Sequence, residues 1–190
     1  MGAVDFVAKP RIRLVDGIHQ LATQMVEKVR IVASAPGFAT SFAARLDSLC
    51  QIAVQEAVHG ARKLPGHAYI APGGRHFREG RSGANYFAVV DDGELVNRHK
   101  PSVEVLFRSV VLVVGRNAYG MMLTGMGGDG AKAMPELKDA GSYNFVQDEA
   151  TSIVFGMPLE AIQHGAADEV LTLQDIAPAL PGRLHAAVDS

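Results

Sequence analysis

A short glycine-rich segment, Gly125-Met-Gly-Gly-Asp-Gly130, holds the residue types with the clearest chemical potential. It follows residues 118–124, which read as a buried strand, and it precedes residues 131–140, which read as a helix. A carboxylate on such a turn, here Asp129, can orient the histidine of a Ser-His-Asp hydrolase. Alternatively, Asp129 only complements the positive end of the helix dipole, which contributes ~0.3–1 kcal/mol.

The same segment fits the G-x-G-x-x-G pattern of dinucleotide-binding proteins. Asp148 and Glu149 lie at the end of the next predicted strand, where that pattern expects an acidic residue. Two features argue against a nucleotide. Asp129 would put a carboxylate where the phosphate charges should lie, and the unit comes late in the chain instead of opening it. We therefore expect no cofactor.

Composition excludes several other classes of protein. The 190 residues include 18 Lys and Arg against 20 Asp and Glu, with no block of like charge, so we expect no nucleic-acid partner. The longest apolar run, residues 110–114, is far shorter than the ~20 residues of a membrane span. Cys50 is the single cysteine, and no His-x₃-His or Cys-His cluster suggests a metal. These features predict a cytoplasmic protein that is not a membrane protein.

The strands and helices expected around Asp129 follow no regular order before Ala118 and alternate after it. We expect strands at 4–8, 52–58 and 67–71, helices at 16–32, 38–49 and 103–114, and a hairpin of 86–90 and 94–97 around Asp92-Gly93. From Ala118 onward strands and helices alternate, which predicts an α/β fold with a doubly wound, mostly parallel sheet and flanking helices. Ligands of such sheets bind beyond the carboxyl ends of the strands, so the loops after Thr124 and Gln147 are the candidates.

Several motifs in a fixed order narrow the choice of family. They are Leu64-Pro-Gly-His-Ala-Tyr-Ile-Ala-Pro-Gly73, His76, Asn97-Arg-His-Lys-Pro-Ser-Val103, Leu123-Thr-Gly-Met-Gly-Gly-Asp-Gly130, Gln147-Asp-Glu149 and Phe155-Gly-Met-Pro158. From about Pro36 to the C-terminus the chain resembles the catalytic domain of the chemotaxis response regulators that are protein-glutamate methylesterases. Residues 2–10 resemble the last strand of a phosphoreceiver domain, with Lys9 at its phosphate-contacting lysine. The resemblance implies a receiver remnant plus linker helix at 1–35 and an incomplete methylesterase domain at 36–190.

The resemblance also implies a chemistry and a loss. In the family a serine attacks the γ-methyl ester of a chemoreceptor glutamate, a histidine takes its proton and an aspartate orients that histidine, and glutamine side chains are deamidated by the same apparatus. Asp129 matches the aspartate, and Met126 and Gly127 match the loop of the oxyanion donors. The serine and histidine turns, with the first two strands of the sheet, are missing where Ser34 runs into Pro36, a loss of ~30 residues.

No other residue is a good substitute for the missing pair. Ser34 lacks the following glycines of a nucleophile turn, and the resemblance makes His67, His76 and His99 structural or rim residues. His59 and His164 lie beside glycines at element ends, His19 lies on the linker helix, and Cys50 reads as a small apolar residue. We therefore expect an inactive family member whose partners are chemoreceptor cytoplasmic helices, or alternatively a non-catalytic module that binds a receptor or another partner.

The missing unit also predicts a weakness of the fold. Two absent strands expose a sheet edge and apolar helix faces, and each unpaired buried backbone group costs ~1–3 kcal/mol. We expect marginal stability unless the linker helix or another subunit fills the gap.

Overall fold

The computed structural model describes residues 4–8 and 37–186, with side chains for residues 37–180. The elements are, in chain order, β1 (Val4–Ala8), α2 (Phe38–Asp47), β2 (Ala53–Glu56), β3 (His67–Ile70), β4 (His76–Ser82), β5 (Asn85–Asp91), α3 (Val103–Val113), the 3₁₀ turn η1 (Gly115–Asn117), β6 (Ala118–Met122), α4 (Ala133–Asp139), β7 (Tyr143–Gln147), α5 (Met157–Gln163), β8 (Glu169–Leu171) and α6 (Leu173–Ala186). The predicted helix at 16–32 lies outside the described residues.

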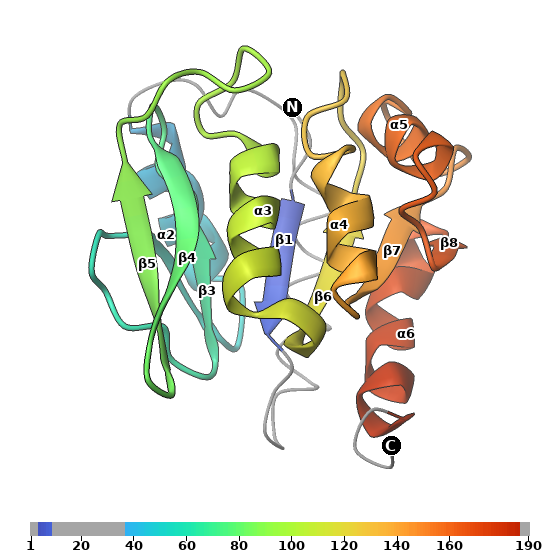
Figure 1. Cartoon of the computed structure of the whole chain (residues 1–190). Coiled ribbons are helices and arrows are strands. Elements are labelled where there is room, and N and C mark those ends of the chain that lie inside the picture. The colour runs from blue at the N-terminus through green and yellow to red at the C-terminus, as the bar shows by residue number, and fades with distance from the viewer. Residues whose placement is uncertain (1–3, 9–36, 187–190) are drawn as a thin grey trace.

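The main sheet has the strand order β1-β6-β7-β8 (Figure 1). Strands β6, β7 and β8 are parallel, and each follows a helix or 3₁₀ turn, which confirms the predicted α/β class. Strand β1 confirms the strand expected at residues 4–8, and it pairs with β6 in the antiparallel direction, with Val4 opposite Met122 and Ala8 opposite Ala118.

Helices cover both faces of this sheet. On one face, residues of α3, α4 and α5 pack with alternate residues of β6 and β7, including Phe107, Val110, Met134, Leu137, Ala161, Ala118, Met122 and Val146. On the other face, the intervening residues Tyr119, Met121 and Phe145 pack against Ile176 and Leu180 of α6. The period-2 alternation of β6 and β7 therefore divides the core into two layers, as a doubly wound sheet requires.

Two smaller sheets complete the described fold. Strands β2 and β3 are parallel and pack under α2 through the cluster Ala43, Leu46, Val54 and Ala68. Strands β4 and β5 form an antiparallel hairpin against α3, where the Glu79 N–H donates to the Ser109 hydroxyl at 2.8 Å.

The hairpin predicted around Asp92-Gly93 is wrong. Strand β5 ends at Asp91 and pairs backward with β4, so the reversal falls at Gly83-Ala84, between the paired residues Ser82 and Asn85. The charged sequence of β4 hid this strand, because it contains both Arg78 and Glu79.

Arg78 and Glu79 of β4 both have charged partners in the folded chain. The Arg78 side chain donates to Asp91 Oδ2 at 2.6 Å, and buried Glu79 pairs with Lys63. Lys63 Nζ also lies 5.3 Å from the ring centre of Tyr69. Burial raises the pKa of Glu79, and the attraction of Lys63 offsets only part of that rise.

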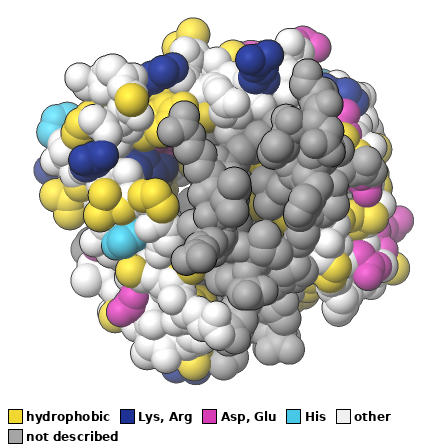
Figure 2. All heavy atoms as spheres, turned by 90° about the horizontal axis from the view of Figure 1, so that it is seen from below, with side chains coloured by type: hydrophobic (Ala, Val, Ile, Leu, Met, Phe, Trp, Pro, Cys, Tyr) yellow, Lys and Arg dark blue, Asp and Glu magenta, His cyan; other side chains and the backbone are white. Residues whose placement is uncertain are grey.

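Figure 2 shows that on the face seen from below the basic side chains lie mostly on the hairpin side and the acidic ones mostly on the side of β8.

We expect Gly120→Ala in β6 to lower the free energy of unfolding by about 1–3 kcal/mol, through overpacking. An added Cβ would lie 2.4 Å from Asn144 Oδ1, and Asn144 is held in place because its amide donates to Met134 O at 2.9 Å and Ala166 O at 3.1 Å. Urea unfolding measures the change. Gly128→Ala is the control, since its Cβ would meet only the movable Glu160 side chain, at 3.3 Å. Equal effects at both positions would contradict this packing.

We expect the hairpin to add an acid-sensitive contribution to stability. The hydrogen bond from Arg78 holds the pKa of Asp91 below its ordinary value, so the ionised form is favoured in the folded chain. This stability is present above the unfolded pKa of ~3.9 and is lost as pH falls through the lower folded pKa. Asp91→Asn should therefore lower the Tm at pH 7, and its difference from wild type should shrink below about pH 4. Exposed Glu149→Gln is the control variant. A difference between wild type and Asp91→Asn that stays constant with pH would refute the pairing.

Candidate active site

The loops after β6 and β7 meet at the carboxyl end of the sheet, as the sequence predicts. Gly125 N–H donates to Val154 O at 3.0 Å, and Gly125 O accepts the N–H groups of Gly156 at 3.1 Å and Met157 at 2.8 Å. Gly125 and Phe155 also form an isolated parallel bridge. The parallel pairing thus continues beyond the ends of β6 and β7 and joins the loops that follow these two strands.

Gly156 permits this close approach. A Cβ at this position would lie 2.7 Å from Gly125 O and 3.0 Å from Gly127 N. The Phe155-Gly-Met-Pro158 motif therefore has a structural task, which is to hold the glycine-rich loop against the start of α5.

Asp129 lies buried at the amino end of α3. Its Oδ2 accepts the Val103 N–H at 2.7 Å, and its Oδ1 accepts the Ser102 hydroxyl at 2.7 Å and the Asn97 side-chain amide at 2.9 Å. The Glu104 N–H approaches Oδ1 at 3.4 Å. Asp129 therefore caps α3, whereas the sequence suggested that a purely structural Asp129 would serve the helix that follows it.

Glu104 of α3 makes the return contact to α4. Its Oε2 accepts the Ala133 N–H at 3.3 Å, and its Oε1 binds the Arg108 guanidinium at 2.7 Å. Asp129, in the loop before α4, thus accepts an N–H from the first turn of α3, and Glu104 of α3 accepts an N–H from the first turn of α4. Asn97 and Ser102 belong to the Asn97–Val103 motif, but the sequence did not predict their contacts with Asp129, and it did not single out Glu104. Ser102 carried a further signal, as a serine directly before a helix.

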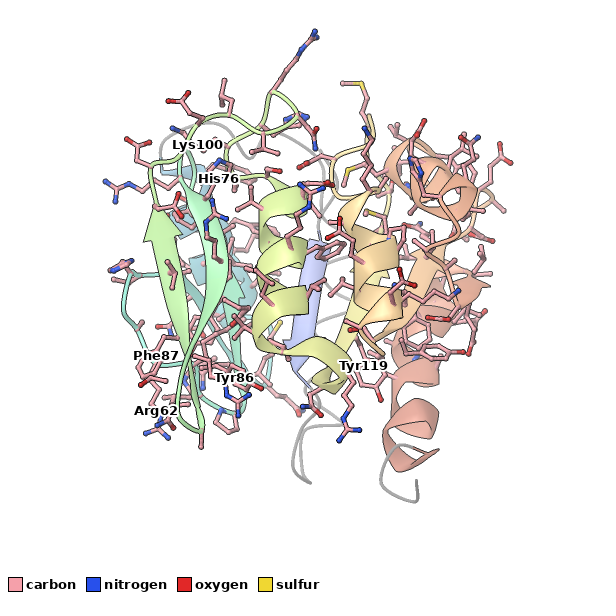
Figure 3. All side chains as sticks on the ribbon, viewed as in Figure 1. Arg62, His76, Tyr86, Phe87, Lys100 and Tyr119 are labelled. Atoms are coloured by element: carbon pink, nitrogen blue, oxygen red, sulfur yellow. The ribbon has the colours of Figure 1, made fainter. Side chains whose placement is uncertain are left out.

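His76 is fully buried beside this network. Its Nε2 lies 2.7 Å from Glu94 O, and its Nδ1 accepts the Ser102 N–H at 3.3 Å. This pattern assigns the proton to Nε2 and uses both ring nitrogens for backbone contacts. His76 and Lys100 lie at the end of the molecule where α3 begins, whereas Arg62, Tyr86, Phe87 and Tyr119 lie at the opposite end (Figure 3). The structural role expected for His76 is confirmed.

Ser102, His76 and Asp129 are neighbours but do not form a triad. The Ser102 hydroxyl donates directly to Asp129, and His76 contacts the backbone of Ser102 instead of its hydroxyl. A triad needs the histidine between the nucleophile and the carboxylate.

Met126 and Gly127 form the exposed crest of the glycine-rich loop. The Met126 side chain is 73% exposed, and Gly127 has φ +86°, a conformation that favours glycine. Within residues 4–8 and 37–186, no acceptor binds the N–H group of either residue. The oxyanion role that the resemblance implies for this loop stays a prediction.

Four other histidines lie within residues 37–180, and each contacts a nearby group of its own region. His59 Nδ1 accepts the Val90 N–H at 3.2 Å, His67 Nδ1 lies 3.1 Å from Pro65 O, and His164 Nε2 lies 4.0 Å from Glu160 Oε2. The backbone of His99 pairs with Val96. Burial, followed by the charge of Asp47, raises the pKa of Cys50. Ser34 and His19 lie outside the described residues.

No group of three or more His, Cys, Asp and Glu side chains in the part of the chain that the structure describes is placed to hold a metal ion. None of the described helices has the length and apolar character needed to cross a bilayer.

Comparison with known proteins decides the family. The family described as CheB methylesterase matches residues 16–180. The chain belongs to this family. A protein-glutamate methylesterase/protein-glutamine glutaminase of Albidiferax ferrireducens is 55% identical over 260 residues, which cover 100% of this chain and 70% of the relative. A protein of Ralstonia nicotianae with the same description is 58% identical over 150 residues, which cover 79% of this chain but 39% of the relative.

The fold of the chain is also similar to a solved structure from this family. The crystal structure of the Thermotoga maritima CheB methylesterase catalytic domain is similar with a TM-score of 0.74 and 35% identity, over 77% of each chain. The alignment with the Albidiferax relative extends over 70 more residues than the 190 of this chain. Within the aligned region, that relative therefore has about 70 residues that this chain lacks. This gap is larger than the ~30 residues of one βαβ unit that the sequence led us to expect.

We expect Asp129→Ala to lower the free energy of unfolding by about 1–3 kcal/mol, because it leaves the buried donors at the start of α3 without an acceptor. Chemical denaturation followed by circular dichroism measures the loss. Asp139→Ala removes an exposed carboxylate at the end of α4 and should change stability by about 0.5 kcal/mol or less. If the two variants were equally stable, Asp129 would have no capping role.

Proposed function

We propose that this chain is a CheB-family protein that retains the aspartate and the oxyanion loop of a methylesterase site but lacks a working serine and histidine. The observation that carries the proposal is the network of Asp129, which is buried and fixed by α3, Ser102 and Asn97 with no histidine bound to it among the described residues. In this reading the chain hydrolyses glutamate γ-methyl esters and glutamine amides far more slowly than its intact relatives.

The retained residues would have defined tasks in the complete reaction. A serine oxygen attacks the ester carbonyl, and the negative charge that develops on the carbonyl oxygen needs preorganised donors. The N–H groups of Met126 and Gly127 suit that task, because they are exposed and held by Gly125 and Gly156. Asp129 would orient the imidazole that accepts the serine proton, and methanol would leave before water releases the glutamate.

Ser102 and His76 do not restore this chemistry. Ser102 is 2% exposed and its hydroxyl donates to Asp129, so within the described residues no histidine is placed to take its proton and substrate cannot reach its oxygen. His76 is fully buried with both nitrogens bonded. Since triad members act as a unit, an orphan Asp129 supports only residual catalysis.

The wider setting belongs to the same proposal. We place the chain in the cytoplasm, with chemoreceptor cytoplasmic helices as its partners. Residues 1–35 would be the receiver remnant and linker, and residues 36–190 the incomplete catalytic domain.

Methanol release from methylated receptor fragments tests the inactivity. With the purified chain we expect release at the rate of the enzyme-free control, and the same rate for Asp129→Ala. The Ralstonia relative serves as the active control. Release near the rate of that relative would overturn the proposal. It would also point to a base outside residues 4–8 and 37–186.

A second candidate function, binding without catalysis, is favoured by apolar side chains around the site. Met126, Ile153 and Val154 are 73%, 66% and 44% exposed, and Gly125 N–H joins their two loops through Val154 O. Exposed apolar groups gathered on joined loops are typical of a protein-binding surface.

We expect the chain to bind receptor cytoplasmic fragments, and Met126→Ser with Ile153→Ser to weaken that binding about tenfold, through lost apolar contact. Immobilised receptor fragments and surface plasmon resonance measure the Kd. Leu112→Ser is the control, because Leu112 is 86% exposed near the far end of α3. Absence of binding by the wild-type chain would reject this candidate, and equal loss in the Leu112 variant would reject the assigned surface.

A further inference from the structure

We propose that Arg98 is a recognition residue that pairs with a carboxylate of the protein segment bound at the candidate site, with Lys132 as a second cation beside it. This role rests on the function proposed above, and it gives the bound receptor segment a chemistry. The segment is a helix that carries glutamate carboxylates next to its apolar side chains.

Arg98 lies at the tip of a two-residue turn beside the network of Asp129. Val96 and His99 exchange backbone hydrogen bonds of 3.2 and 2.9 Å, so Asn97 and Arg98 are the two central residues of the turn. Both have positive φ, 51° for Asn97 and 65° for Arg98. A hairpin turn of this kind favours glycine at its second position. Arginine there strains the backbone, and such strain is typical of functional sites.

The turn is fixed on both sides of Arg98. The Asn97 side-chain amide donates to Asp129 Oδ1 at 2.9 Å, and Lys100 Nζ donates to Asp92 Oδ1 at 2.6 Å. Arg98 itself is exposed. Because its backbone is already held in place, only the side chain loses freedom when it binds a ligand.

Lys132 brings a second positive charge to this end of the molecule. It is exposed and lies three positions after Asp129, where the glycine-rich loop leads into α4. Figure 1 shows this loop at the same end of the molecule as the loop between β5 and α3, and the bond from Asn97 to Asp129 joins the two loops. Among the side chains of residues 37–180, no ion pair involves Arg98 or Lys132.

The acidic groups of these two loops leave the two cations available. Asp129 is buried and bound by the donors of α3 and Asn97, and Asp92 pairs with Lys100. Glu94 is the third carboxylate of these loops, and it is exposed. Arg98 and Lys132 therefore outnumber Glu94 among the exposed charges that have no ion pair within residues 37–180.

A helix with a carboxylate one turn from an apolar side chain fits this arrangement. Met126 and Ile153 offer exposed apolar contact at the site. The guanidinium of Arg98 can bind both oxygens of a carboxylate, a geometry that a glutamate side chain provides. A methyl ester and an amide are neutral, so they do not replace it. Arg98 therefore favours the demethylated, charged form of the receptor segment.

Surface plasmon resonance with the full chain tests this preference. The immobilised probes are a receptor cytoplasmic fragment with glutamate at its modified positions and the same fragment with glutamine there. We expect the glutamate fragment to bind about fivefold more tightly, as an exposed ion pair allows. Arg98→Gln should reduce that ratio to about twofold, the double variant with Lys132→Gln should abolish it, and Arg98→Lys should restore part of it. Arg116→Gln is the matched control, because Arg116 is exposed at the amino end of β6, opposite the loop of Asp129.

The outcomes separate the role of Arg98 from the proposed function. If the wild-type chain binds neither fragment, both the binding function and the role of Arg98 are overturned. If it binds both fragments equally, or if Arg98→Gln keeps the full preference for glutamate, the role of Arg98 alone is overturned.

Thermal melting of Arg98→Gly distinguishes recognition from support of the turn. Glycine adopts positive φ without strain, so we expect the Tm to rise by about 2 °C while the preference for the glutamate fragment falls. A lower Tm in this variant would show that the Arg98 side chain stabilises the turn, and it would overturn the proposal.

Discussion

The carboxylate of Asp129 at the amino end of α3 is the contact on which the arrangement of the site depends. It joins a loop after β6 to a helix before β6, and the contact is closed from the other side by Glu104 and the first turn of α4. Gly130 is part of the same contact, since a Cβ there would lie 2.2 Å from Val103 Cγ1. Helices α3 and α4, two of the three that cover one face of the sheet, are thereby fixed relative to each other through carboxylates and backbone donors.

Asp129 has a structural task whether or not the chain is catalytic. Its carboxylate accepts the Val103 N–H and the Ser102 hydroxyl, which would otherwise be buried without partners. Under the proposed function, this structural task is what keeps the glycine-rich loop in place without a serine and a histidine beside it.

Sequence reasoning succeeded where periodicity and turn residues were strong. The alternation after Ala118 located β6, β7 and their helices, and the glycine-rich segment located the loop of Asp129. It failed for β4, whose charges are neutralised by residues far along the chain, and for Asn97 and Glu104, whose contacts span about 30 positions. The direction of β1 was equally out of reach, because strand pairing depends on which edge the rest of the fold leaves open.

The carbonyl of Gly125 has a mechanical consequence. It accepts two N–H groups at the start of α5, while its own N–H is bound to Val154, so the crest at Met126 has no independent hinge on that side. The same helix α5 places Ala161 in the core. Met126 thus lies on a turn whose base is tied by backbone hydrogen bonds to a helix of the core, so the most exposed part of the loop has a buried anchor.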